Sequence, residues 1–442
     1  MSVSRLLSPP ATFGQRLRYL GPSLIVTANI VGAGELIMTT TLGARAGFIA
    51  LWVILVSCMI KVMIQLEFGK HAINTGETTM EAFTKLPGPT IGRGHWSIWT
   101  WLVVKIIHFA QLGGMIGGVA LALNMAFPVL PVWAWTWIAA LLTVFLVLDG
   151  KYRRIETISV SLVALFSVFT IFCVYLLQST EYAISASDLM EGMSFELPAA
   201  VIGVALGAFG ITGVSSEEAI SYPYWCLEKG YAQYTGEREQ TDEWSSRAKG
   251  WIKVMYLDAF ISMIIYTITT AAFYLLGAAI LNQLGQVPDG YATISTLSQI
   301  YTESVGPGAK YIFLAGAVIV LFSSVFINAA SNQRIITDGF AQLGFLKYSD
   351  ETQRKKWFRA LAWFLPLAWA ALFVTVQSPV FMVMLGGLVL SLLLLVVVFA
   401  AFHMRYRRLD QRLRPSKFYD LLFWISGLSI VAFGVQAMVR LL

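Results

Sequence analysis

Two short segments of the sequence place glycine beside a carboxylate inside long apolar runs, and the second segment also contains hydroxyl residues. The first is residues 30–35 (IVGAGE) and the second is residues 211–218 (ITGVSSEE). Glycine weakens a helix by about 1 kcal/mol relative to alanine, and a carboxylate at bilayer depth costs a few kcal/mol. A helix that breaks there frees backbone N–H groups, which attract anions, and C=O groups, which attract cations. The two segments therefore predict a binding site for a small ion.

The residues of this predicted site have simpler alternative roles. Close helix packing explains many glycines in membrane helices, and we expect it for those of residues 114–118, but packing does not explain the carboxylates. Glu35 and Glu218 could instead cap a new helix, since Ser215 and Glu218 have the spacing of a capping box. Capping also requires a break. The expected substrate-binding residues are Gly32, Ala33, Gly34, Glu35, Thr212, Gly213, Val214, Ser215, Ser216 and Glu217.

The composition indicates what kind of protein contains these two segments. The chain has 442 residues, of which 57% are hydrophobic and 13% are charged, and its mean hydropathy is +0.69. A soluble chain carries about twice that share of charge, and an aromatic share of 13% argues against disorder. The composition predicts an all-α polytopic membrane protein. No nucleic-acid partner is expected from the net charge of +6, because the basic residues lie in short stretches between apolar runs.

Eleven apolar runs are long enough to cross a bilayer, which takes about 20 residues. Basic residues gather in the N-terminal segment and in every second loop, while the loop 178–198 is acidic. This asymmetry predicts a multi-pass protein of the plasma (bacterial inner) membrane, with a cytoplasmic N-terminus and an external C-terminus. The predicted spans are 21–46, 48–68, 98–125, 132–149, 157–177, 199–226, 252–280, 309–333, 357–376, 380–403 and 418–439.

The two segments lie in the first and the sixth of these spans. Interrupted helices at matched positions of two halves are typical of transporters built from inverted repeats. We expect one transmembrane domain over 1–442, with a first repeat (1–177), a second repeat (199–403) and an additional helix (418–439). No Walker A loop is present, so the chain is not expected to drive transport by its own ATP hydrolysis. No cofactor and no obligatory protein partner are expected.

Beyond these patterns, residues 21–26 (GPSLIV) leading into the first break resemble the start of the Nramp divalent-metal transporters. The same order continues through the second span, residues 116–124 (IGGVALALN) and the second break. The resemblance implies a LeuT-type fold of five plus five inverted helices, with helices 1 and 6 discontinuous. It also implies alternating access around a site between these two helices.

The predicted site departs from the family pattern. Nramp transporters have Asp-Pro-Gly-Asn at the first break, where this chain has residues 32–35, and a Met-Pro-His type motif at the second, where this chain has residues 214–216. The family's acids for proton movement in the third span are replaced in this chain, around Leu112 and Met115. The resemblance therefore implies a divergent branch without a transition-metal site, similar to Nramp-related bicarbonate transporters.

The leading expectation for the substrate is a small inorganic anion, with bicarbonate first. Without the family's aspartate, the breaks offer backbone N–H and hydroxyl donors, which suit an oxyanion. The alternative is a divalent cation, Mg²⁺ or Mn²⁺, which becomes the better interpretation if Glu35 and Glu217 face the site.

An ion gradient must drive such a transporter, and two sources are open. Ser323 and Ser324 in the eighth span resemble the sodium site of LeuT-fold transporters, although serines in membrane helices also bond back to carbonyls. A proton is the alternative driver, with His108, Asp258 or Glu67 as relays. The expected partners are therefore the substrate ion, coupling Na⁺ or H⁺, and the lipid bilayer.

Four other polar residues lie inside the spans. For Lys61 and Lys105 we expect snorkelling toward the interface. Asn328 and Asn332 either bridge helices or line a path. No enzyme is expected, because the four histidines lie in separate segments and no nucleophile–base signature accompanies them. A channel, or a receptor-like protein that binds without transport, is the alternative class.

Overall fold

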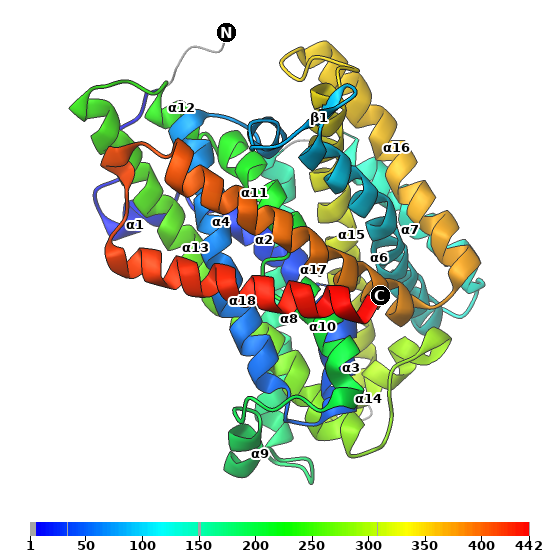
Figure 1. Ribbon diagram of the computed structural model, residues 1–442. Coiled ribbons are helices and arrows are strands. Elements are labelled where there is room, and N and C mark those ends of the chain that lie inside the picture. Colours follow the sequence, from blue (N-terminus) through cyan, green and yellow to red (C-terminus); the bar gives the residue numbers. More distant parts are fainter. Residues whose placement is uncertain (1–5, 33, 149–151, 307, 442) are drawn as a thin grey trace.

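The computed structural model describes residues 6–32, 34–148, 152–306 and 308–441, and most of them are helical. Figure 1 shows long helices that cross one another in one bundle, with the short helix α9 projecting at one end. The α-helices are α1 (Phe13–Leu17), α2 (Pro22–Ile30), α3 (Thr40–Ala46), α4 (Leu51–Thr75), α5 (Thr79–Phe83), α6 (Trp96–Ala126), α7 (Val132–Val147), α8 (Tyr152–Leu177), α9 (Ala186–Glu191), α10 (Ile202–Ile211), α11 (Ser216–Lys229), α12 (Tyr231–Thr235), α13 (Asp242–Leu276), α14 (Thr293–Val305), α15 (Ala309–Gln342), α16 (Glu351–Val376), α17 (Pro379–His403) and α18 (Lys417–Leu441).

Shorter elements extend or connect these helices. The strands β1 (Thr90–Ile91) and β2 (Gly94–His95) pair antiparallel, with Thr90 opposite His95. The π-helices are η1 (Glu35–Thr39), η3 (Gly277–Asn282) and η5 (Met404–Arg408), and the 3₁₀-helices are η2 (Ala199–Val201), η4 (Gly290–Ala292) and η6 (Gln411–Leu413).

The long helices have the length and hydropathy of membrane spans. Among the described residues, eight helices pass this test, and a ninth does so when the bent pair α2 and η1–α3 is taken as one span. The class of all-α polytopic membrane protein is confirmed. The count of eleven remains a prediction, because α7 and the Ser167–Leu177 part of α8 are shorter apolar helices.

The first predicted break lies between α2 and η1. Pro22 occupies the first turn of α2, where its missing N–H costs nothing, and α2 ends at Ile30. The chain resumes as a π-helix at Glu35 and continues as α3, with a bend of 42° between the two parts. Ala33, one of the predicted site residues, lies outside the described residues. The predicted interruption of the first span is confirmed.

The second predicted break lies between α10 and α11. Thr212 leaves the helix with extended backbone (ψ 132°), and Gly213 has φ +67°, which favours glycine because it lacks a Cβ. A Cβ on Gly213 would also lie 2.9 Å from the Cα of Cys58 on α4. The helix restarts at Ser216. This break is therefore confirmed as well.

Glycines let the helices around these breaks approach closely. A Cβ on Gly210 of α10 would lie 1.9 Å from the carbonyl oxygen of Gly387 on α17. The expected packing role in α6 is confirmed for Gly114 and Gly117, whose Cβ atoms would lie 2.8 Å from the Pro379 oxygen and 2.1 Å from the Phe373 ring. Gly118 differs, because a Cβ there would make only ordinary contacts at 3.5 Å.

The start of α2 is anchored by Asp258 of α13. Its carboxylate accepts hydrogen bonds from the backbone N–H groups of Gly21 (2.9 Å) and Ser23 (2.6 Å). These N–H groups have no partner within the helix, so the buried carboxylate supplies one. This geometry shows Asp258 as a cap of the first broken helix, and a role of Asp258 as a proton relay stays a prediction.

Outside the spans, Glu77 ties the end of α4 to η5. Its carboxylate lies 3.0 Å from His71 Nε2, accepts two hydrogen bonds from Arg408 (2.7 and 2.8 Å), and pairs with Lys85. Burial raises the pKa of Glu77, but the hydrogen bonds from His71, Arg408 and Lys85 outweigh it and hold the pKa below its ordinary value. The ionised carboxylate is therefore stabilised by folding.

We expect Gly210→Ala to lower the unfolding free energy by about 1–3 kcal/mol, because the added methyl group cannot fit against the Gly387 backbone. Gly118→Ala is the matched control and should leave stability nearly unchanged. Thermal unfolding of the purified protein in detergent, followed by tryptophan fluorescence, measures both. Equal melting temperatures for the two variants would contradict the close approach of α10 and α17.

We also expect an acid-dependent loss of stability from Glu77. Because its pKa is lower in the folded state, its contribution is full above the ordinary pKa of 4.5 and is lost as pH falls below that value. Melting temperatures measured from pH 7 down to the acid limit of the detergent check this. Glu77→Gln should melt at a lower temperature than wild type at pH 7, and this difference in melting temperature should become smaller as the pH falls. A difference that does not change with pH would contradict the assignment.

Candidate ion-binding site

The two helix breaks are in direct contact through Glu35. This carboxylate, fully buried on η1, accepts a hydrogen bond from the backbone N–H of Gly213 (3.1 Å), and the Thr212 hydroxyl lies 3.4 Å from its other oxygen. The Thr39 hydroxyl also donates to it. Among the described residues, Glu35 accepts no hydrogen bond from a backbone N–H of its own helix, so the capping expectation from its spacing is not met there. Glu35 binds the N–H that the second break exposes.

Lys61 of α4 occupies the opposite end of the second break. Its ammonium group donates to the carbonyl oxygens of Phe209 (2.6 Å) and Thr212, at the carboxyl end of α10. The side chain is fully buried, so the expectation that Lys61 snorkels to the interface is wrong. A protein cation thus lies where free carbonyls would attract a cation from solution.

The start of α11 is capped as the sequence predicts. Ser215 accepts a hydrogen bond from the Glu217 N–H (3.1 Å), and Glu218 accepts one from the Ser215 N–H (3.0 Å), which completes the capping box. Asn29 of α2 donates to the same Glu218 carboxylate. Asn328 of α15 in turn donates to Asn29 (2.6 Å). Asn328 therefore bridges helices, and a polar chain links α15, α2 and α11.

Glu217 points away from the first break toward α6. It forms an ion pair with Lys105, which also donates to Asn332 (2.7 Å) and lies 3.5 Å from His108 Nδ1. Lys105 is buried, so the snorkelling expectation is wrong for this lysine too. The second oxygen of Glu217, Oε1, is buried without a hydrogen-bond partner in the part of the chain that the structure describes. The pair joins α11, α6 and α15 beside the break.

The two serines of the predicted coupling site behave differently. Ser323 donates back to the Val320 carbonyl within α15 (2.9 Å), as serines in membrane helices often do. Ser324 is fully buried against the first break, where a Cβ on Gly32 would lie 1.5 Å from its hydroxyl oxygen. Ser324 is thus placed beside the break, and a sodium ion there remains a prediction.

The structure gathers part of the predicted substrate set. Gly34 and Glu35 meet the second break directly, because a Cβ on Gly34 would lie 2.5 Å from Ile211. Ser216 instead donates to the Leu390 carbonyl of α17 (3.1 Å). The predicted substrate-binding residues did not include Asn29, Lys61 or Lys105, although a lysine inside an apolar run is itself a sign of a functional site. Val214 is buried in the second break, and substrate binding by the whole set stays a prediction.

The donor set around the breaks is not that of a clustered metal site. Across residues 6–32, 34–148, 152–306 and 308–441, no group of three or more His, Cys, Asp and Glu side chains could hold a metal ion. The carboxylates near the breaks are each engaged by a different element, as described for Glu35, Glu217 and Glu218. The arrangement can exchange hydrogen bonds and charge with a small ion.

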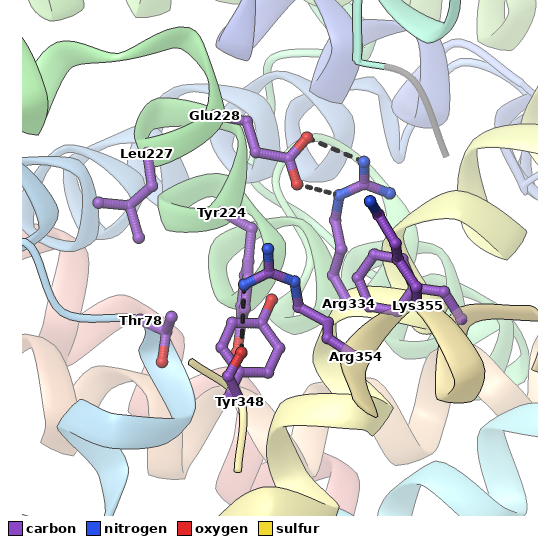
Figure 2. Close-up of a pocket in the computed structure, with 9 residues that line it drawn as sticks. Thr78, Tyr224, Leu227, Glu228, Arg334, Tyr348, Arg354 and Lys355 are labelled. Carbon is purple, nitrogen blue, oxygen red and sulfur yellow. Dashed lines mark hydrogen bonds and ion pairs between the residues drawn. The ribbon is translucent and has the colours of Figure 1, made fainter. Parts of the chain in front are cut away.

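A polar pocket of about 370 Å³ lies between α11, α15 and α16, where Figure 2 shows Glu228 facing the Arg334 guanidinium. Two hydrogen bonds of 2.5 and 2.8 Å join them. Arg354 and Lys355 also line the pocket. Glu228 lies eleven residues after Glu217 on α11, about 16 Å along the helix, so α11 leads from the break to the pocket.

Solved structures share this architecture over almost the whole chain. A mutant of the manganese transporter from Eremococcus coleocola aligns with a TM-score of 0.69 at 16% identity, covering 99% of this chain and 90% of that one. The nucleobase-cation-symport-1 transporter Mhp1 aligns with a TM-score of 0.60 at 15% identity, covering 98% and 94%. MhsT with bound L-phenylalanine reaches 0.55 at 16% identity, covering 98% and 100%. The chain therefore has a LeuT-type fold, as predicted.

The sequence comparisons assign the family. The chain belongs to the Nramp family, because residues 23–440 match the family model described as natural resistance-associated macrophage protein-like. It is 22% identical to the divalent metal cation transporter MntH of Bacillus subtilis over 432 residues, covering 95% of this chain and 91% of that one. It is 33% identical over 149 residues to the metal transporter Nramp6.2 of Populus trichocarpa, covering 33% of this chain and only 26% of that one. Family membership confirms a transporter rather than an enzyme.

We expect Glu35 and Lys61 to stabilise the second break as a unit. Removing one partner leaves a buried charge uncompensated, so Glu35→Gln or Lys61→Met alone should cost about 3–5 kcal/mol. The double variant should cost clearly less than the sum, because both charges then disappear together. Denaturant unfolding of the purified variants measures the cycle, with the exposed Lys356→Gln as a control. Additive losses would contradict the coupling.

Proposed function

We propose that this Nramp-type secondary transporter carries a small inorganic anion, with bicarbonate as the first candidate. The observation that carries the proposal is the buried Lys61 ammonium group on the α10 carbonyls. A divalent cation 4 Å from that charge would be repelled by about 8 kcal/mol at an effective dielectric constant of about 20. An anion in the same place would be attracted. The charge of Lys61 would therefore make the site select anions over cations.

Bicarbonate suits a site that contains both donors and a carboxylate. Its oxygens can accept hydrogen bonds from Lys61 and from the Gly213 N–H, while its hydroxyl can donate to Glu35. An anion without a hydroxyl group would face the Glu35 carboxylate with no donor. The pocket at the far end of α11 supports the same sign of charge, because three basic side chains and one carboxylate line it. An anion is drawn to such a basic pocket.

A divalent cation is the second candidate, and the relatives favour it. The Bacillus subtilis relative is named for divalent metal cations, and the Eremococcus coleocola structure is that of a manganese transporter. None of the relatives reported above is named for bicarbonate or sodium. In this chain, the unpartnered Oε1 of Glu217 among the described residues is a free ligand atom for a hard cation. Lys61 and Lys105 would have to move away or lose their protons before such an ion could bind.

For the driving ion, we propose sodium beside Ser324. Its hydroxyl lies against Gly32 of the first break, and broken helices expose carbonyl oxygens that coordinate sodium in transporters of this type. Ser323 would join only after releasing the Val320 carbonyl. A proton is the alternative, moving along the polar cluster of Lys105, Glu217 and His108.

We propose that the transporter spans the plasma membrane with a cytoplasmic N-terminus and an external C-terminus, as the basic residues suggest. We also propose the division into repeats at 1–177 and 199–403, with 418–439 as an addition. The elements support this division, since η1 and the break before α11 fall at matched places. A label attached to each terminus, probed from outside intact cells, tests the orientation.

Proteoliposome uptake tests the substrate. We expect saturable bicarbonate uptake at alkaline pH that an inward sodium gradient increases, and no saturable flux of Mn²⁺ or Mg²⁺. Lys61→Gln should lower bicarbonate uptake at least tenfold, because the attracting charge is lost, whereas Lys61→Arg keeps the charge and should retain more activity. Ser323→Ala with Ser324→Ala should remove the sodium dependence.

The same assay distinguishes the alternatives. Strong Mn²⁺ or Mg²⁺ flux without bicarbonate flux would contradict the anion and establish the second candidate. Sodium-dependent uptake that survives the double serine change would remove the sodium assignment alone. No flux of any of these ions in folded protein would argue for a receptor-like role.

A further inference from the structure

An apolar groove of about 830 Å³ lies on the bundle between α4, α13 and α18, on the side where Figure 1 shows α18 crossing the other two. Its volume is within the range of about 300–1,000 Å³ that holds small molecules. Methionine, leucine and aromatic side chains form most of its wall, including Met59, Met63 and Phe260. Met59 and Phe260 are more than half exposed, so the groove is open to the surrounding membrane.

One end of the groove is polar and basic. Arg16, Lys253 and the Ser416 hydroxyl line this end, while no aspartate or glutamate is among the lining residues. Arg16 is oriented by hydrogen bonds from its guanidinium to the Pro10 and Ala11 carbonyls (3.3 and 3.4 Å). Because carbonyl groups carry no net charge, these contacts do not neutralise the charge of Arg16. Two positive charges therefore remain at the groove's end.

The acids near this end are already paired with other cations. Glu67, which follows the lining residue Leu66, is buried in an ion pair with Lys70. Asp420, at the start of α18, pairs with Arg405. Within the part of the chain that the structure describes, Arg16 and Lys253 form no ion pair, so their charges are left for a ligand.

The groove has the depth of one leaflet. Lys253 and Met263 line it ten residues apart on α13, which is about 15 Å along a helix. The hydrocarbon core of a bilayer is about 30 Å thick, so the groove reaches from the interface to about the midplane. A phospholipid that stands in one leaflet has this same layout, with a charged head at the interface and chains ending at the midplane.

We infer that the groove binds one anionic phospholipid, with its phosphate between Arg16 and Lys253 and an acyl chain along α4, α13 and α18. Basic side chains beside an apolar channel between membrane helices are suited to acidic head groups. Tyr256 and Tyr419, whose rings stack at 6.0 Å, form the wall beside the head group. The lipid would join the last helix to two helices of the bundle, and this inference is independent of the transported ion.

Native mass spectrometry of the purified full chain tests the inference, with phosphatidylglycerol and phosphatidylcholine supplied in equal amounts. Wild type should retain one phosphatidylglycerol in preference to phosphatidylcholine. Arg16→Gln with Lys253→Gln should weaken phosphatidylglycerol binding about 30-fold, from about 1 kcal/mol for each basic residue, and leave phosphatidylcholine unchanged. The control removes the same charge on α16, with Lys356→Gln and Arg359→Gln, and should bind like wild type.

A second variant tests the apolar part. Met63→Trp narrows the groove without changing charge and should reduce retention of both lipids. Equal retention of the two lipids by wild type would overturn the anionic assignment, as would unchanged selectivity in the Arg16 and Lys253 variant. Unchanged retention in Met63→Trp would place the lipid elsewhere. A second copy of the chain seated on this face, seen as a lipid-independent dimer that Met63→Trp disrupts, would also overturn it.

Discussion

The site depends on how the second helix break is neutralised. A break at membrane depth leaves backbone groups without partners, and each such group costs several kcal/mol in an apolar environment. Here the Glu35 carboxylate binds the exposed N–H of Gly213, and the Lys61 ammonium group binds the exposed carbonyls of Phe209 and Thr212. The two opposite charges arrive from two other elements, η1 and α4. An interrupted helix can persist there because both of its ends are satisfied.

This neutralisation also gives a physical route to coupling between binding and movement. An anion that binds at the break competes with Glu35 for the Gly213 N–H, and a cation competes with Lys61 for the carbonyls. Either competition loosens one link between the second break and a neighbouring element, η1 or α4. The polar chain from Asn328 through Asn29 to Glu218 lies next to the same break. A small ion could therefore shift packed helices because it replaces bonds that hold them together.

The sequence predicted the two breaks and the LeuT-type class because these follow from local composition. Glycine beside a carboxylate in an apolar run is visible without a structure, and so is the capping box of Ser215 and Glu218. The role of Glu35 was not predictable, because its spacing fits a cap equally well and its true partner is 178 residues away. Lys61 and Lys105 were misjudged for a similar reason. Whether a lysine snorkels or is buried depends on which helices pack around it.

Family membership and the geometry of the site favour different substrates. The Nramp relatives reported are named for metals, whereas the chain places a lysine at the cation-attracting end of the break. Selectivity between ions of opposite sign depends on a few charges within about 4–6 Å of the site, so one buried lysine can outweigh overall similarity. Under the proposed function, the same fold would carry a different ion because of its local electrostatics.

The most direct measurement is an experimental structure of the protein determined with bicarbonate bound. The account predicts density for the anion between the Lys61 ammonium group and the Gly213 N–H, with the Glu35 carboxylate displaced from that N–H. An intact Glu35–Gly213 hydrogen bond with the anion bound elsewhere would contradict the account. Continuous helices across residues 30–35 and 211–216 would contradict it as well.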